Sequence, residues 1–86
     1  MIRFTTESGS IYEVDFDGRR FRKVKTTESS RINEFPWQKF ITLHSRETTE
    51  SPLGEDDQIR VGYQYLFSNF DIWIKTSAVV SIEETP

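Results

Sequence analysis

The residues most suited to chemistry are five cations packed into the seven positions 19–25, R-R-F-R-K-V-K. The whole chain carries a formal net charge of -3, so this basic strip stands against an acidic background. Guanidinium and ammonium groups at this density attract phosphates, carboxylates and acidic protein surfaces. The strip therefore predicts an anion-binding site formed by Arg19, Arg20, Arg22 and Lys23. The alternative interpretation is that these cations protect an edge strand from pairing with other chains.

Two further groups of residues suit the same chemistry. Trp37 lies in E-F-P-W-Q-K-F, where a proline fixes the backbone and Lys39 supplies a nearby cation. An exposed indole beside cations can stack on a nucleobase, whereas a core position is the structural alternative. The neighbouring residues Lys75, Thr76 and Ser77 offer an ammonium and two hydroxyls to an anion, or else form a bend between strands.

The sequence predicts no catalytic or metal centre. His44 is the only histidine and there is no cysteine, which excludes disulfides and thiolate metal sites. The consecutive carboxylates Glu55, Asp56 and Asp57 are typical of a solvated loop. The chain contains no phosphate-binding glycine loop, no dinucleotide fingerprint and no nucleophile elbow. We therefore expect neither enzymatic activity nor a cofactor.

Apolar and polar residues alternate along most of the chain, which is typical of β-strands. Turn signals such as Gly9 and Asp17-Gly18 separate the alternating runs. The pattern predicts one all-β domain over residues 1–86, a small SH3-like or partly open β-barrel of about six antiparallel strands. The apolar members of the alternating runs include Trp37, Ile41 and Leu43; Ile59, Val61, Tyr63, Tyr65 and Phe67; and Ile72, Ile74, Ala78, Val80 and Ile82.

The basic strip breaks this alternation. In an extended strand Phe21 and Lys23 share one face, and Arg20, Arg22 and Val24 share the other. Because Phe21 and Val24 are both apolar, the sequence predicts a bulge near Arg22 that would turn both of them toward the core.

Charge and composition indicate which partners and which cellular compartment to expect. Residues 1–44 hold eight cations and six anions, whereas residues 45–86 hold three cations and eight anions. The polar, acidic segment 45–58 predicts a mobile loop. Net acidity argues against general nucleic-acid binding, because that affinity comes from neutralising phosphates. No apolar run reaches the ~18 residues of a membrane span, and the N-terminus lacks a signal peptide, so we expect a cytoplasmic protein without a membrane partner.

Three short motifs occur in order: T-T-E-S-G-S-I-Y-E-V-D at residues 5–15, V-G-Y-Q-Y-L-F at 61–67 and K-T-S-A-V-V-S-I at 75–82. Together they resemble small accessory proteins of bacteriophages and prophages, with Lys75 and Ala78 standing where arginine and proline are common in that group. The resemblance implies a small all-β protein of a mobile element. Some phage proteins of this size counter host defence by binding a nuclease or by sequestering a nucleotide signal.

We therefore expect a non-catalytic phage-type binding protein that captures an anionic ligand. The leading hypothesis is an anti-defence protein that sequesters a nucleotide immune signal, with the basic strip neutralising phosphates and Trp37 stacking on the base. One alternative is an inhibitor or adaptor that binds a host defence protein through the acidic loop or an aromatic face. Another is a small structural phage protein. A thin core also leaves a homo-oligomer open as the stable form.

Overall fold

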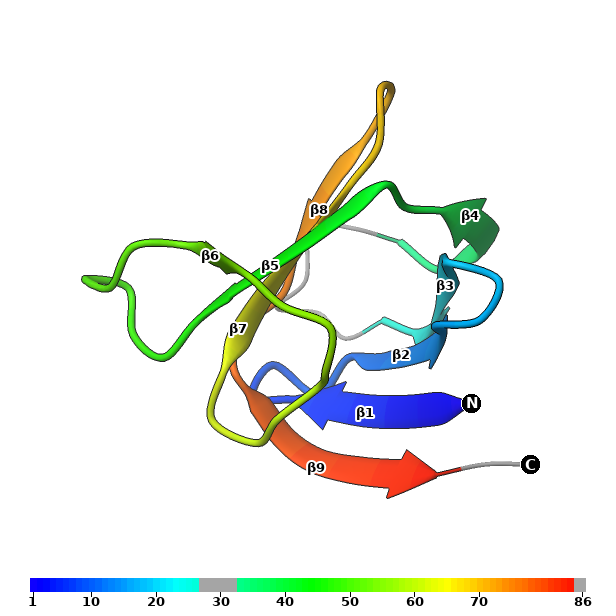
Figure 1. Ribbon diagram of the computed structural model, residues 1–86. Helices are drawn as coiled ribbons and strands as arrows, with labels where there is room; N and C mark the ends of the chain where they lie inside the picture. The colour runs from blue at the N-terminus through cyan, green and yellow to red at the C-terminus, as the bar shows by residue number, and fades with distance from the viewer. Residues whose placement is uncertain (27–32, 85–86) are drawn as a thin grey trace.

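The structure is a computed structural model that describes residues 1–26 and 33–84 (Figure 1). All regular elements in these residues are β-strands, which confirms the all-β prediction. No helix in the described ranges is long and apolar enough to span a bilayer. The strands are β1 (Ile2–Thr6), β2 (Ile11–Asp15), β3 (Arg20–Lys25), β4 (Phe35–Lys39), β5 (Thr42–Arg46), β6 (Gly54–Glu55), β7 (Gln64–Ser68), β8 (Trp73–Lys75) and β9 (Val79–Glu84).

The strands form two antiparallel sheets, one with the order β4-β3-β2-β1-β9 and the other with the order β6-β5-β7-β8. The sequence predicts about six strands in an SH3-like or partly open barrel, whereas the described residues form nine strands in two sheets that do not close into a barrel. Two of the predicted runs each divide into two strands, because the chain crosses between the sheets. It passes from β4 to β5 at Phe40 and Ile41, and from β8 to β9 at residues 76–78.

The core lies between the sheets and is mainly aromatic. Phe67 of the four-stranded sheet stacks on Phe21 of the five-stranded sheet, with ring centroids 4.4 Å apart. Phe40 meets both rings edge-on, and Phe4 extends the cluster on the other side of Phe67. Large rings compensate for the small size of the chain, since each buries ~150–250 Å².

The hairpin predicted at Asp17-Gly18 is present as the β2–β3 turn, but its left-handed residue is not the glycine. The left-handed residue is Arg19, with φ of 48°, and the amide of Arg19 donates to the carbonyl of Phe16 at 3.2 Å. A side chain at Gly18 would displace a neighbour, because a Cβ there would lie 2.9 Å from a carboxylate oxygen of Asp15. Asp15 accepts a hydrogen bond from the Gly18 amide at 3.2 Å, so the two residues must approach closely.

The bulge predicted in the basic strip near Arg22 is not found there: the irregularity opposite Arg22 lies in β4, and β3 keeps its alternation of buried and outward residues over 20–24. The pairing of β3 with β4 shifts between Phe21 and Lys23, because two residues of β4 oppose Arg22 alone. Phe21 is buried as predicted, whereas Val24 remains half-buried and Lys23 occupies the second inward position at 2% exposure. The Lys23 ammonium lies 5.4 Å from the ring centroid of Tyr12.

The segment 45–58 is not a single irregular loop. Ser45 and Arg46 complete β5, and β6 pairs with β5 through the registers His44–Glu55 and Ser45–Gly54. The acidic stretch is therefore a hairpin with a loop at residues 47–53, visible as the projection beside β6 in Figure 1. The mobility of that loop stays a prediction.

Phe67→Ala tests the aromatic core. The substitution removes ring contacts to three neighbours, so we expect the free energy of unfolding to fall by about 3–5 kcal/mol in urea titrations. If that variant does not fold, Phe67→Leu should show a smaller loss. Phe70→Ala is the matched control, because Phe70 is 95% exposed and its loss should change stability by less than about 0.5 kcal/mol. Equal losses at the two positions would contradict this packing.

Candidate functional site

Three of the predicted site residues meet on the outer face of the five-stranded sheet. The guanidinium carbons of Arg20 and Arg22 lie 4.6 and 4.7 Å from the ring centroid of Trp37. Trp37 is half-buried there, so it belongs neither to the core nor to a fully open platform. The strand that carries the two arginines has neighbours on both sides, β2 and β4. The interpretation of the basic strip as edge protection is therefore wrong.

Both arginines already have carboxylate partners. Nε of Arg20 lies 3.0 Å from Oδ2 of Asp15, and Nε of Arg22 donates to Oε1 of Glu13 at 2.6 Å. Arg3 of β1 reaches the second Glu13 oxygen at 3.0 Å. The strand registers explain these pairs, because Glu13 lies opposite Arg3 of β1 and Arg22 of β3, and Asp15 lies opposite Arg20. Much of the positive charge of the strip is thus balanced within the sheet.

Glu13 is the centre of this arrangement. Its side chain is only 5% exposed although it lies on the outer face, because two arginine side chains cover it. Burial raises the pKa of Glu13, but the hydrogen bonds from Arg3 and Arg22 outweigh burial and leave this pKa below its usual range.

The other two cations of the predicted site lie elsewhere. Burial lowers the pKa of Lys23, while the carboxylate of Glu34 acts in the opposite direction. Arg19 is exposed at the β2–β3 turn, where its guanidinium donates to the carbonyl of Ile41 at 2.6 Å and lies 5.0 Å from the ring centroid of Phe40. The basic strip is therefore divided among the outer face, the core and a turn.

Lys75, Thr76 and Ser77 form the bend between β8 and β9. Thr76 is buried; its hydroxyl accepts from the amide of Tyr65 at 3.1 Å and donates to the carbonyl of Ser77 at 2.8 Å. The Ser77 hydroxyl accepts from the amide of Ser8 at 3.3 Å. These contacts match the interpretation of the segment as a bend, while Lys75 remains exposed at the end of β8.

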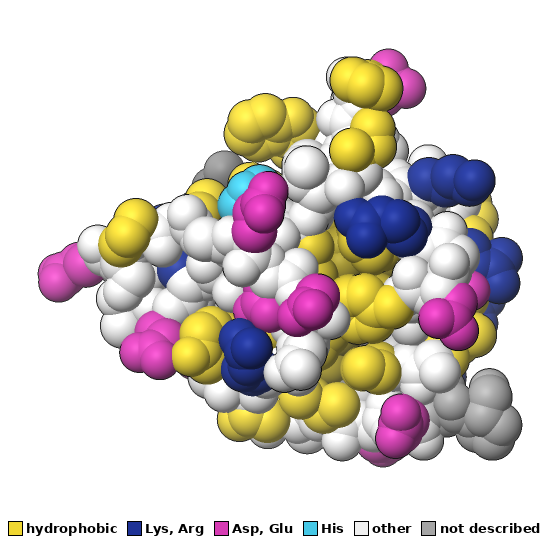
Figure 2. Space-filling view, in the orientation of Figure 1, with side chains coloured by type: hydrophobic (Ala, Val, Ile, Leu, Met, Phe, Trp, Pro, Cys, Tyr) yellow, Lys and Arg dark blue, Asp and Glu magenta, His cyan; other side chains and the backbone are white. Residues whose placement is uncertain are grey.

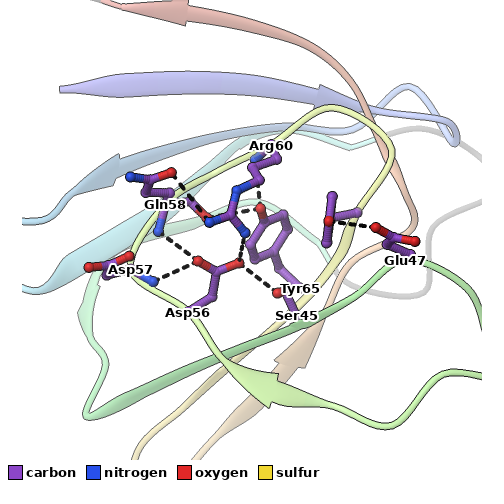
Figure 3. A network of polar contacts seen from close by, with 8 residues as sticks. Ser45, Glu47, Asp56, Asp57, Gln58, Arg60 and Tyr65 are labelled. Carbon is purple, nitrogen blue, oxygen red and sulfur yellow. Dashed lines mark hydrogen bonds and ion pairs between the residues drawn. The ribbon is translucent and has the colours of Figure 1, made fainter.

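A concavity of about 680 Å³ lies on another part of the surface, between the β5–β6 hairpin and residues Asp57, Arg60 and Tyr63. Figure 3 shows that the Asp56 carboxylate organises its wall. One oxygen accepts from the amides of Asp57 and Gln58, and the other accepts from Ser45 and Arg60 at 2.6 and 2.9 Å.

This network has a structural role. The Asp56 side chain is 2% exposed, which corrects the prediction that it belongs to a solvated acidic loop. The Tyr65 hydroxyl supports the same segment from behind by donating to the carbonyl of Gln58 at 2.9 Å, and burial raises the pKa of Tyr65 to about 12. Because Asp56 already accepts four hydrogen bonds, it holds the chain at 56–60 in place rather than offering a free ligand group.

The β7–β8 hairpin carries a feature that the sequence analysis did not assign to a site. Phe70 is 95% exposed and Trp73 is 74% exposed. The hairpin projects from the body in Figure 1, and hydrophobic side chains gather at its end in Figure 2. The turn signal Ser68-Asn69-Phe70-Asp71 was the available clue, because it places an aromatic residue at the tip of a turn.

Asn69 fixes the shape of this tip. Its side-chain oxygen accepts from the amides of Asp71 and Ile72 at 2.7 and 2.9 Å, and its side-chain nitrogen donates to the carbonyl of Lys39 at 2.7 Å. The exposed rings are therefore presented by an ordered turn that is tied to the β4–β5 connection.

No protein-family model, curated protein or solved structure matches the chain. The described residues also contain no group of three or more metal-ligating side chains. A functional proposal for this protein therefore rests on its own contacts and exposed surfaces.

Glu13→Gln tests the ion-pair network. We expect the variant to be less stable at pH 7 by about 1.5–3 kcal/mol, because charge-assisted hydrogen bonds are lost. The folded-state pKa of Glu13 lies below the ordinary value of 4.5, so its contribution is present above pH 4.5 and is lost as the pH falls through the folded-state pKa.

The difference in unfolding free energy between wild type and Glu13→Gln should therefore shrink in acid, as measured by urea titrations between about pH 2 and 7. Glu83→Gln is the control, because Glu83 lies in register with Arg3 at the exposed sheet edge and should matter little. A difference that is constant with pH would show that the Glu13 charge does not stabilise the fold.

Proposed function

We propose that this protein is a non-catalytic binding module that recognises another protein through the tip of the β7–β8 hairpin. The observation that carries the proposal is the exposure of Phe70, in the turn of the projecting β7–β8 hairpin, and of Trp73, at the start of β8. Isolated exposed apolar residues are normal on protein surfaces, but two large exposed aromatic rings on one hairpin favour a binding surface. Aromatic anchors of this kind dominate the binding energy of protein interfaces.

The packing supports a binding role over a folding role for Phe70. At 95% exposure its ring contributes little to the core, and the buried cluster is complete without it. The hydrogen bonds of Asn69 order the turn before any partner arrives. A preordered contact loses less conformational entropy on binding, which favours affinity.

The resemblance to phage accessory proteins suggests the biological setting of this proposal. In that setting the bound protein would be a host defence factor, and the module would act in the host cytoplasm as its inhibitor or adaptor. Binding alone would be sufficient for this role, since blocking a protein surface requires no chemical step.

The test is affinity capture from a soluble bacterial extract with matched baits. Wild type is compared with Phe70→Ser, with Trp73→Ser and with the control Lys39→Ser, and the bound proteins are quantified by mass spectrometry. We expect at least one protein to be retained by wild type and the control but lost with both aromatic variants. For that protein in purified form, each aromatic substitution should weaken binding at least about 30-fold, as for a hot-spot residue. Identical captured sets for all four baits would refute the proposal.

A second candidate function is the capture of an anionic ligand such as a nucleotide. The observation that favours it is the convergence of Arg20, Arg22 and Trp37 on one open sheet face. The arginine side chains are 43% and 38% exposed, so their outward sides remain accessible to a phosphate. Their carboxylate partners weaken this candidate, because a bound anion must share guanidinium groups with Asp15 and Glu13.

Thermal-shift measurements with cyclic dinucleotides, ATP and GMP test this candidate. A specific ligand at about 100 times its dissociation constant should stabilise the fold by about 2.7 kcal/mol. Trp37→Ala together with Arg20→Gln should abolish the shift, whereas Arg46→Gln, on the other sheet, should not. No shift with any of these nucleotides would remove nucleotide capture from consideration and leave the hairpin proposal untouched.

A further inference from the structure

We propose that two copies of this chain associate through β8, which forms one edge of the four-stranded sheet among the described residues. The pairing is antiparallel and follows a two-fold axis through Ile74. This inference goes beyond the proposed function, because it uses the main-chain edge of β8 with the side chains of Trp73 and Lys75. It shares Trp73 with the proposed recognition site but leaves Phe70 free.

The hydrogen-bond pattern shows which groups of β8 face outward. The residue pairs just before and just after β8 are hydrogen-bonded through their main chains. The main-chain amide of Thr76 donates to the carbonyl of Tyr65 at 2.8 Å, and the main-chain amide of Asn69 donates to the carbonyl of Ile72 at 3.0 Å. Bonded pairs alternate along an antiparallel ladder, so Ile74 is also bonded toward β7. The main-chain groups of the two residues beside it, Trp73 and Lys75, therefore point away from β7, toward the edge that no described strand pairs with.

These outward groups are complementary to a second copy of themselves. In an antiparallel pair centred on Ile74, Trp73 of one copy lies opposite Lys75 of the other. Each Trp73–Lys75 pair then exchanges both of its main-chain hydrogen bonds, and Ile74 meets its own copy in the close, non-bonded position. A closed two-fold arrangement uses the same patch on both partners.

The side chains agree with this register. Trp73 and Lys75 are both exposed and share one face of β8, so the pairing brings the ammonium of one copy against the indole of the other. A cation against a tryptophan ring is a favourable cross-strand pair. On the opposite face Ile74 is half-buried at the margin of the core, so its copy would extend the apolar contact.

A lysine on a sheet edge ordinarily discourages strand addition. Here the two-fold register places Lys75 opposite an aromatic ring rather than opposite another lysine. A foreign strand would need an aromatic residue and a cation at the same spacing to make the same contacts, whereas a second copy supplies both. This reciprocity favours self-association over the addition of an unrelated strand.

The dimer would join two four-stranded sheets into one continuous sheet and would display two Phe70 tips. Two tips on one particle raise the avidity for a partner that carries repeated sites. Because β8 is only three residues long, the interface is small, and we expect a dissociation constant in the range of about 1–100 µM.

Sedimentation velocity at about 1–500 µM chain tests the association over the concentrations that this affinity requires. Wild type should shift with concentration from the 10.2 kDa monomer toward twice that mass. Lys75→Pro should remain monomeric, because proline removes an outward N–H and blocks the edge without removing a bond to β7. Phe70→Ala should dimerise like wild type, which separates this inference from the hairpin proposal.

Cysteine cross-linking supplies a register test that does not depend on the proline variant. The natural chain has no cysteine, so a single introduced thiol reports only on its own position. Ile74→Cys should form a disulfide dimer readily under mild oxidation, because residues in the non-bonded two-fold pair lie within disulfide range. Trp73→Cys should cross-link at least about 10-fold more slowly, since its copy lies two positions away along the strand.

Three outcomes would overturn the inference. The first is a wild type that stays monomeric up to the highest concentration. The second is a dimer that Lys75→Pro leaves intact while circular dichroism shows that the variant is folded. The third is equal cross-linking rates for Ile74→Cys and Trp73→Cys, which would indicate random collisions rather than the two-fold register.

Discussion

The stacking of Phe21 on Phe67 is the contact on which the rest of the structure depends. It joins the five-stranded sheet to the four-stranded sheet with ring centroids 4.4 Å apart. An 86-residue chain can bury only about 60–65% of the surface that it exposes when unfolded, so a few large rings must hold the layers together. Once these rings face inward, the period of two along each strand decides which residues face outward.

The outer face of the five-stranded sheet follows from that constraint. With Phe21 inward, Arg20 and Arg22 must point outward, where the register of β3 with β2 aligns them with Asp15 and Glu13. The same parity directs Lys23 inward, next to Tyr12. The basic strip therefore has two structural roles in this sheet: Arg20 and Arg22 form an outer ion-pair network, and Lys23 supplies a buried ammonium.

The four-stranded sheet places aromatic residues both in the core and on the surface. Its inner face contributes Tyr65 and Phe67 to the core, while its β7–β8 hairpin extends past the core and exposes Phe70 and Trp73. Aromatic residues inside the molecule stabilise the fold, whereas those on the hairpin are available for recognition. The edge of β8 that no described strand covers lies beside this tip. Trp73 would take part in both recognition and self-association, whereas Phe70 would serve recognition alone.

The sequence by itself determined the all-β class and most turn positions, because alternation and turn residues act over a few neighbouring positions. It also determined that the strip is basic. Only the tertiary structure decided that the strip lies in an internal strand, that Glu13 neutralises part of it and that Lys23 is buried. Strand order, register and the depth of a side chain depend on partners distant in the chain, and a local pattern carries no information about those partners. For the same reason, the exposure of Phe70 and Trp73 depends on how the two sheets pack and not on the local sequence.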